Sequence, residues 1–162
     1  MTAPLLVFGY GNPSRGDDAL GPLLLERLAE LDLPHVELLT DFQLQVEHAV
    51  DLQGRELVLF IDASVSCAPP YGFSQLDAQK DTSYSSHAMS PAAVLHAYRE
   101  LYGPPPPAYL LAVRGEYFEL GEALSEAAAH NLEAAFKLLE NLCADPGHQA
   151  WDQFIMPPEI TI

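Results

Sequence analysis

The amino-acid sequence predicts one α/β domain, a three-layer αβα sandwich whose central sheet is mostly parallel. Its 162 residues match the length of one ordinary domain. Apolar residues make up 49% of the chain and charged residues 19%, which is enough apolar surface to bury a core. Short apolar runs alternate with longer segments of helical leucine periodicity. Parallel strands covered by helices on both faces produce that alternation.

The first half of the chain has the order strand, helix, strand, helix, strand. The apolar run at 5–8 ends at Gly9, as a buried strand ends in a tight turn, and predicts the first strand. Leucines at positions 20, 24, 28 and 31 form one stripe and predict a helix over 19–31. The next predicted elements are a strand over 36–39, a short helix over 46–52 and a strand over 57–61 that Asp62 closes.

The second half continues this alternation after a polar region. Residues 64–71 and 78–86 are predicted to be loops, with a strand between them over 73–76. Ser90 is the expected N-cap of a helix that has Pro91 at its first position and reaches about Tyr102. The last predicted elements are a core strand over 109–113 and a long helix over 125–142. The whole chain, 1–162, is predicted to be a single domain.

The charge of the chain disfavours several classes of partner. The sequence has 7 Lys and Arg residues against 23 Asp and Glu residues, a formal net charge of -16, which repels nucleic acids and anionic membranes. The apolar start has no basic flank and is shorter than a signal-peptide core, so we expect a cytoplasmic protein. There, Cys67 and Cys143, which form no zinc-ligand pattern, are expected to be reduced thiols.

Three side chains are predicted to meet at one edge of the sheet. In a parallel sheet, the loops that leave the carboxyl ends of the strands gather along a single edge. Asp18 follows the first strand, Asp62 ends the strand over 57–61, and His87 precedes the helix that begins at Pro91. Two carboxylates and an imidazole suit nickel or zinc better than calcium or magnesium. These residues therefore form a candidate metal site.

Simpler explanations for these residues stay open at this point. Asp18 and Asp62 are acids at a helix start and at a strand end, and His87 lies in a loop. A dinucleotide fingerprint would need glycine where Ser14 stands, and the pair Asp17 and Asp18 would repel a pyrophosphate. Neither a zinc-protease helix motif nor a Gly-x-Ser-x-Gly elbow occurs. The remaining histidines are interpreted as surface or packing residues: His35, His48, His96, His130 and His148.

A longer motif is more specific. The run at 9–22, GYGNPSRGDDALGP, resembles the opening of the nickel-iron hydrogenase maturation protease family. Further family features follow in family order: the apolar strand that ends in Asp62-Ala63, the segment SHAMS at 86–90, and the segment at 116–125 with FELG and LS. The resemblance covers roughly the first 140 residues. It implies a single maturation protease domain with a phosphorylase/hydrolase-like αβα sandwich.

The resemblance also implies a reaction and roles for single residues. The family's three metal-contacting positions correspond to Asp18, Asp62 and His87, which are then also the expected catalytic residues. The implied reaction is one endoproteolytic cut that removes the C-terminal extension of a hydrogenase large-subunit precursor after nickel insertion. The nickel would belong to the precursor, and its coordination would check that the metal is in place. Asp41 and Gln43 are predicted to contact the substrate near the cleavage point.

Some points stay open even with this resemblance. The segments 12–18 and 43–45 look most like members that serve soluble, bidirectional, NAD-linked hydrogenases. No nucleophile or general base is identified beyond the metal site, so the attacking water would be activated by a metal or by a carboxylate. Two other functions are retained: a metal-sensing chaperone that binds the precursor without cutting it, and an unrelated metal-dependent hydrolase on the same scaffold.

Overall fold

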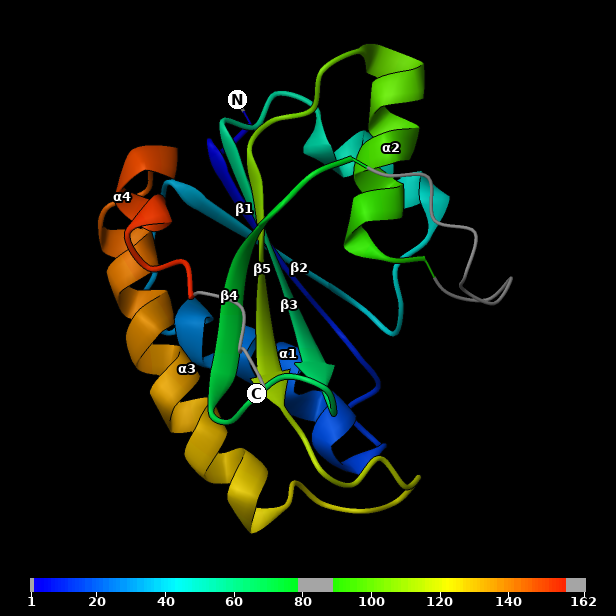
Figure 1. The fold of residues 1–162 in the computed structure, drawn as a ribbon, viewed down its shortest axis with the longest axis vertical. Helices are drawn as coiled ribbons and strands as arrows, with labels where there is room; N and C mark the ends of the chain where they lie inside the picture. Colours follow the sequence, from blue (N-terminus) through cyan, green and yellow to red (C-terminus); the bar gives the residue numbers. More distant parts are fainter. Residues whose placement is uncertain (1, 79–88, 157–162) are drawn as a thin grey trace, which may run out of the picture.

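The computed structural model describes residues 2–78 and 89–156 and confirms the predicted fold class (Figure 1). Five strands form one sheet in the order β2-β1-β3-β5-β4. Their bounds are β1 Leu5–Tyr10, β2 Val36–Asp41, β3 Leu57–Ser64, β4 Tyr71–Leu76 and β5 Ala108–Arg114. All neighbouring pairs are parallel except β4 and β5, which are antiparallel. The sheet is therefore parallel through its middle and mixed only at the β4 edge.

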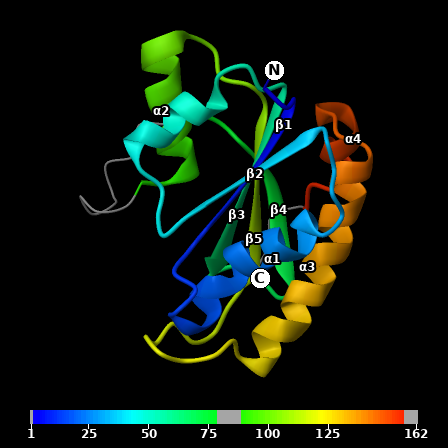
Figure 2. The ribbon, with the colours of Figure 1, turned by 180° about the vertical axis from the view of Figure 1, so that it is seen from behind.

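Helices cover both faces of the sheet and complete three layers (Figures 1 and 2). One face carries α1 Leu20–Ala29, α3 Glu126–Ala144 and α4 His148–Asp152. The other face carries α2 Pro91–Tyr102 and the 3-10 helix η2 Val46–Leu52. The sequence did not predict α4, whose fully buried Trp151 packs on the rings of Phe73 and Tyr109. Among the helices of the described ranges, none is long and apolar enough to span a bilayer.

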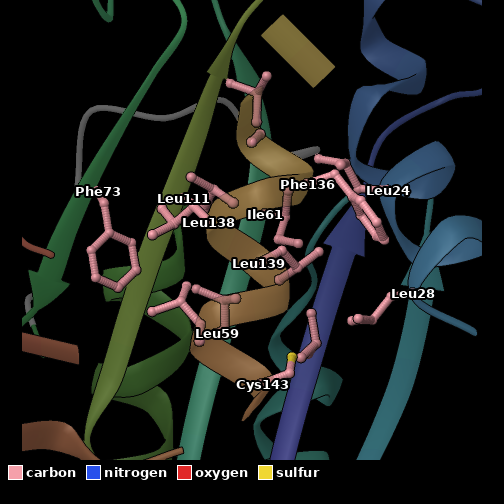
Figure 3. Close-up of a cluster of buried hydrophobic side chains, with 14 of the residues drawn as sticks. Leu24, Leu28, Leu59, Ile61, Phe73, Leu111, Phe136, Leu138, Leu139 and Cys143 are labelled. Carbon is pink, nitrogen blue, oxygen red and sulfur yellow. The ribbon is translucent and has the colours of Figure 1, made fainter. Parts of the chain in front are cut away.

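Alternation along the strands divides the buried side chains between two cores. Leu5 and Val7 of β1 face α1 and α3, whereas Leu6 and Phe8 face η2 and α2. Figure 3 shows the first core between the sheet and its helices. Its labelled side chains are Leu59, Ile61, Phe73 and Leu111 from the strands, and Leu24, Leu28, Phe136, Leu138, Leu139 and Cys143 from α1 and α3. Both faces of the central strands are thus apolar, which explains their continuous apolar runs.

Local capping signals place the helix starts close to where the sequence predicts them. The Ser90 hydroxyl accepts a hydrogen bond from the Ala93 N–H at 3.1 Å, and Pro91 occupies the first position of α2. The Ser125 hydroxyl caps α3 in the same way through the Ala128 N–H, at 3.1 Å. The helix predicted over 19–31 is shorter than expected and is preceded by the 3-10 turn η1, Gly16–Ala19.

The first turn of α1 rests directly on the ends of β1 and β3. A Cβ atom on Gly21 would lie 2.8 Å from the Tyr10 carbonyl oxygen and 3.1 Å from the Ile61 carbonyl oxygen. Only glycine permits this approach of helix to strand. Because η1 leads straight into α1, the approach also brings Asp18 close to Asp62 at the end of β3.

Candidate active site

Asp18 and Asp62 lie together at the carboxyl edge of the sheet. Asp18 belongs to η1, which follows β1, and Asp62 lies near the end of the adjacent parallel strand β3. The charge of Asp18 acts on both Asp62 and the hydroxyl of Tyr10, the last residue of β1. The lower part of Figure 1 shows this edge, where the chain passes from β1 into α1. The structure therefore brings together two of the three side chains expected to meet.

The turn between β1 and η1 wraps around the Asp18 residue. Gly11 has a φ of 147°, and a Cβ atom on it would lie 2.0 Å from the Asp18 carbonyl oxygen. The next residue, Asn12, donates its backbone N–H to the Asp18 carboxylate at 2.7 Å. The glycine motif of the first turn thus fits the close packing of the chain around an aspartate.

Gly11→Ala is expected to open this turn and displace Asp18. The alanine methyl group cannot occupy a position 2.0 Å from a carbonyl oxygen, and a φ of 147° is unfavourable for alanine. We expect a loss of about 1–3 kcal/mol of unfolding free energy in urea titrations. The matched control is Gly147→Ala, since a Cβ atom on Gly147 would meet nothing within 4 Å. Equal stability of the two variants would contradict the proposed steric conflict.

Asp62 is a half-buried carboxyl group with a strongly raised pKa. Burial raises the pKa, hydrogen bonds from the Tyr10 hydroxyl and the Ala63 N–H lower it, and the charge of Asp18 raises it again. The result is a pKa of about 7 in place of the ordinary 3.8. A carboxyl group that titrates near neutral pH can accept and return a proton under physiological conditions. Asp62 is therefore suited to acid–base chemistry as well as to metal binding.

The raised pKa also makes Asp62 costly to the fold at alkaline pH. Asp62 loses its proton near pH 7 in the folded chain, but around pH 4 in the unfolded chain. The contribution of Asp62 to the free energy of unfolding is therefore most favourable below pH 4. It is lost as the pH rises through 7. We expect Asp62→Asn to unfold at higher urea concentration than wild type at pH 8.5, and the difference to shrink by pH 5. A difference that does not vary with pH would contradict this assignment.

Tyr10 is a site residue that the sequence analysis did not single out. Its side chain is 8% exposed, and its hydroxyl donates a hydrogen bond to the Asp62 carboxylate. Burial and then the charge of Asp62 raise the pKa of Tyr10 well above its usual value, so the hydroxyl keeps its proton. The available signal was the alternation of Leu6, Phe8 and Tyr10, which continues a buried face up to the edge of the sheet.

Asp17 has a different role from its neighbour Asp18. Asp17 is fully buried, and its carboxylate accepts hydrogen bonds from the Glu116, Tyr117 and Ser125 N–H groups and from the Ser125 hydroxyl, at 2.7–3.1 Å. Burial alone would raise the pKa of Asp17, but these hydrogen bonds outweigh it and lower the pKa. Asp17 therefore anchors the 116–125 loop, because its charge is satisfied by these hydrogen bonds.

Residues 116–125, the loop between β5 and α3, are bound to the loop that carries Asp18. Besides the four bonds to Asp17, Gly16 N–H donates to the Glu122 carbonyl at 3.1 Å and Gly121 N–H donates to the Ser14 carbonyl at 2.7 Å. A cavity of about 450 Å³ adjoins this loop, lined by Tyr117, Glu119, Glu122, Ala123, Leu124 and Ser125. The 116–125 loop and the loop that carries Asp18 are thus joined by several hydrogen bonds.

The third predicted ligand, His87, lies outside the described residues. Within 2–78 and 89–156, no cluster of three or more His, Cys, Asp or Glu side chains has the arrangement of a metal site. Met89, two positions after His87, donates its N–H to the Leu44 carbonyl at 3.3 Å. This contact lies on the face of the sheet that η2 and α2 cover. Metal binding by Asp18, Asp62 and His87 stays a prediction.

Asp41 and Gln43, the predicted substrate contacts, lie at the end of β2 and just beyond it. Asp41 is paired with Tyr10 in the sheet and is exposed. Its carboxylate contacts the Phe42 N–H at 2.7 Å and the His48 Nε2 atom at 3.2 Å. His48 packs edge-on against Phe8, with ring centroids 4.7 Å apart, and so is a packing residue as predicted. Substrate contact by Asp41 or Gln43 stays a prediction.

Known structures resemble this chain over most of its length, although no protein-family model and no curated protein sequence matches it. The hydrogenase maturation protease HycI of Thermococcus kodakarensis KOD1 is 26% identical, covers 88% of this chain and 94% of its own, and has a TM-score of 0.68. The hydrogenase maturating endopeptidase HybD of E. coli is 26% identical, covers 85% and 91%, and has a TM-score of 0.66. An endopeptidase of Escherichia coli is also 26% identical, with coverage of 83% and 88% and a TM-score of 0.67.

Fold and site together define an α/β protein with paired carboxylates at the carboxyl edge of a mostly parallel sheet. Such a pair can bind a divalent cation or accept a proton from water. The similar structures share the fold over more than four fifths of the chain. They confirm the resemblance that the motif at 9–22 indicates, which is to the nickel-iron hydrogenase maturation proteases.

Proposed function

We propose that this chain is an endopeptidase that removes the C-terminal extension of a nickel-iron hydrogenase large-subunit precursor after nickel insertion. The observation that carries the proposal is the meeting of Asp18 and Asp62 at the strand ends. This occurs in a fold shared with the hydrogenase maturating endopeptidase HybD of E. coli. The family motif in the sequence contains Asp18 and continues to Asp62, so the paired carboxylates belong to the part of the chain that carries the resemblance.

The proposed role of nickel is that of a substrate group carried by the precursor. Asp18, Asp62 and His87 would contact it, since two carboxylates and an imidazole suit this ion. Precursor without nickel would lose the coordination energy and bind less well, so premature cutting is suppressed. The strongly negative chain, with a net charge of -16, also favours a precursor surface that carries positive charge.

The cut itself requires a water molecule that attacks the scissile carbonyl. With its pKa of about 7, Asp62 can take the proton from this water and pass it to the departing amine, so that the peptide C–N bond breaks with no net change on the enzyme. The charge of Asp18 strengthens this proton acceptor. Activation of the water by the precursor's nickel is the alternative route.

The proposed place of action is the cytoplasm. Cys67 and Cys143 are both free thiols, a state that a reducing compartment maintains. Among hydrogenases, the segments 12–18 and 43–45 favour a soluble, NAD-linked, bidirectional enzyme as the source of the precursor. That precursor is the first substrate to be tested.

The decisive experiment is incubation of purified chain with a large-subunit precursor, with and without nickel, followed by intact mass measurement. Loss of a short C-terminal peptide only from the nickel-loaded precursor is the expected result. Binding of the precursor without any mass change would support the metal-sensing chaperone instead. If the precursor is cut both with and without nickel, the peptidase function stands, but the proposed dependence of cutting on nickel is wrong.

A further inference from the structure

The register of the sheet places Tyr10 beside Asp62. β1 and β3 are paired up to Gly9 and Ile61, so Tyr10 and Asp62 occupy the next positions on the two neighbouring strands. Tyr10 belongs to the apolar cluster on the face covered by η2 and α2. Since side chains alternate along a strand, Asp62, two positions after Phe60 of the same cluster, lies on that face too.

The Tyr10 ring is buried and packs against its neighbours in the apolar cluster. It packs edge-on against Phe8, with centroids 6.3 Å apart and planes at 70°, and the side chain is 8% exposed. The ring therefore delivers its hydroxyl to one fixed point at the edge of the sheet. A buried hydroxyl needs a hydrogen-bond partner, and the Asp62 carboxyl group is the polar group on the neighbouring strand position.

We propose that Tyr10 is a positioning residue whose buried hydroxyl donates a hydrogen bond to the Asp62 carboxylate and so orients it for the reaction. This inference rests on the peptidase function proposed above. The Tyr10 hydroxyl and the Ala63 N–H both act on Asp62 as hydrogen-bond donors, and the sheet register places Tyr10 directly beside it. Such supporting contacts orient a reactive group before the substrate arrives, which removes part of the ordering cost from the reaction.

The test replaces one oxygen atom and keeps the ring. Tyr10→Phe is expected to lower kcat on the nickel-loaded precursor by about 10–100-fold, with KM changed far less. The matched control is Tyr109→Phe, because Tyr109 is also buried and its hydroxyl donates to the Asp152 carboxylate at 2.6 Å. Tyr109 lies near the start of β5, at the amino edge of the sheet and so away from the candidate site at the carboxyl edge. We expect Tyr109→Phe to lower the melting temperature but leave kcat unchanged.

The cleavage assay and crystal structures test the positioning role of Tyr10 separately from the peptidase function. If wild type and Tyr10→Phe cut the precursor equally fast, the positioning role is wrong and the peptidase function stands. If wild type does not cut, the peptidase function is wrong, and crystal structures of both proteins still decide the role of Tyr10. The positioning role is supported if the Asp62 carboxylate has one conformation in wild type and is rotated, or occupies two conformations, in Tyr10→Phe. The positioning role is wrong if the Asp62 carboxylate has the same single conformation in both proteins.

Discussion

Asp62→Asn is expected to lower kcat for the nickel-loaded precursor by about 10²–10⁴-fold, the usual contribution of a positioned acid–base group. Asparagine has the shape of aspartate but cannot take a proton from water, and it is a poor ligand for a divalent cation. The measurement is the rate of release of the C-terminal peptide under saturating precursor. The same substitution is expected to stabilise the fold at alkaline pH, so a loss of activity cannot be attributed to unfolding.

A control for this result should make the same chemical change elsewhere. Asp32→Asn does so in an exposed residue just after α1, whose φ of 50° asparagine tolerates well. We expect Asp32→Asn to cut at the wild-type rate and to unfold at the wild-type urea concentration at every pH. Wild-type cutting by Asp62→Asn would remove Asp62 from the reaction, whatever the precursor's metal content.

Asp17→Ala is expected to cost about 3 kcal/mol or more of unfolding free energy. Alanine leaves the Glu116, Tyr117 and Ser125 N–H groups without their acceptor in a fully buried place. Urea titration of the variant gives the loss directly. Because the folded pKa of Asp17 is lowered, its contribution is present above the unfolded pKa and disappears as the pH falls through the folded value. The difference in free energy of unfolding between wild type and Asp17→Ala should therefore become smaller at acidic pH.

The adjacent substitution Asp18→Asn provides the contrast. The side chain of Asp18 is only half-buried and accepts one backbone hydrogen bond, from Asn12, which the asparagine oxygen can keep. We expect little change in unfolding free energy and a large loss of cutting. If Asp17→Ala were as stable as Asp18→Asn, the hydrogen bonds around Asp17 would not have the structural role assigned to them.

Much of the fold could be predicted because its signals are local. Apolar runs identify β1 and β3, and the Ser90-Pro91 pair identifies the start of α2. Sheet order and the antiparallel direction of β4 could not be predicted, since no local pattern records which strands pair. The short helix α4 was missed for a similar reason. It is held by the burial of Trp151 against residues more than forty positions earlier in the chain.

The site divides in the same way. Asp18 and Asp62 could be predicted because acids at the ends of parallel strands share one edge of the sheet. The different fates of Asp17 and Asp18 could not, because the partners of Asp17 lie about a hundred positions away and only the folded chain brings them together. Tyr10 was overlooked because an aromatic residue at the end of an apolar run looks like ordinary core.

The hydrogen-bond partners of Asp17 lie far from it along the chain, so these bonds form only after most of the chain has been synthesised. A ribosome delivers the amino-terminal turn first, but the groups that grip it belong to residues 116–125. A nascent chain that still lacks Ser125 leaves Asp17 without two of its four hydrogen bonds. We therefore expect the turn that carries Asp18 to become fully anchored only late in synthesis of the chain.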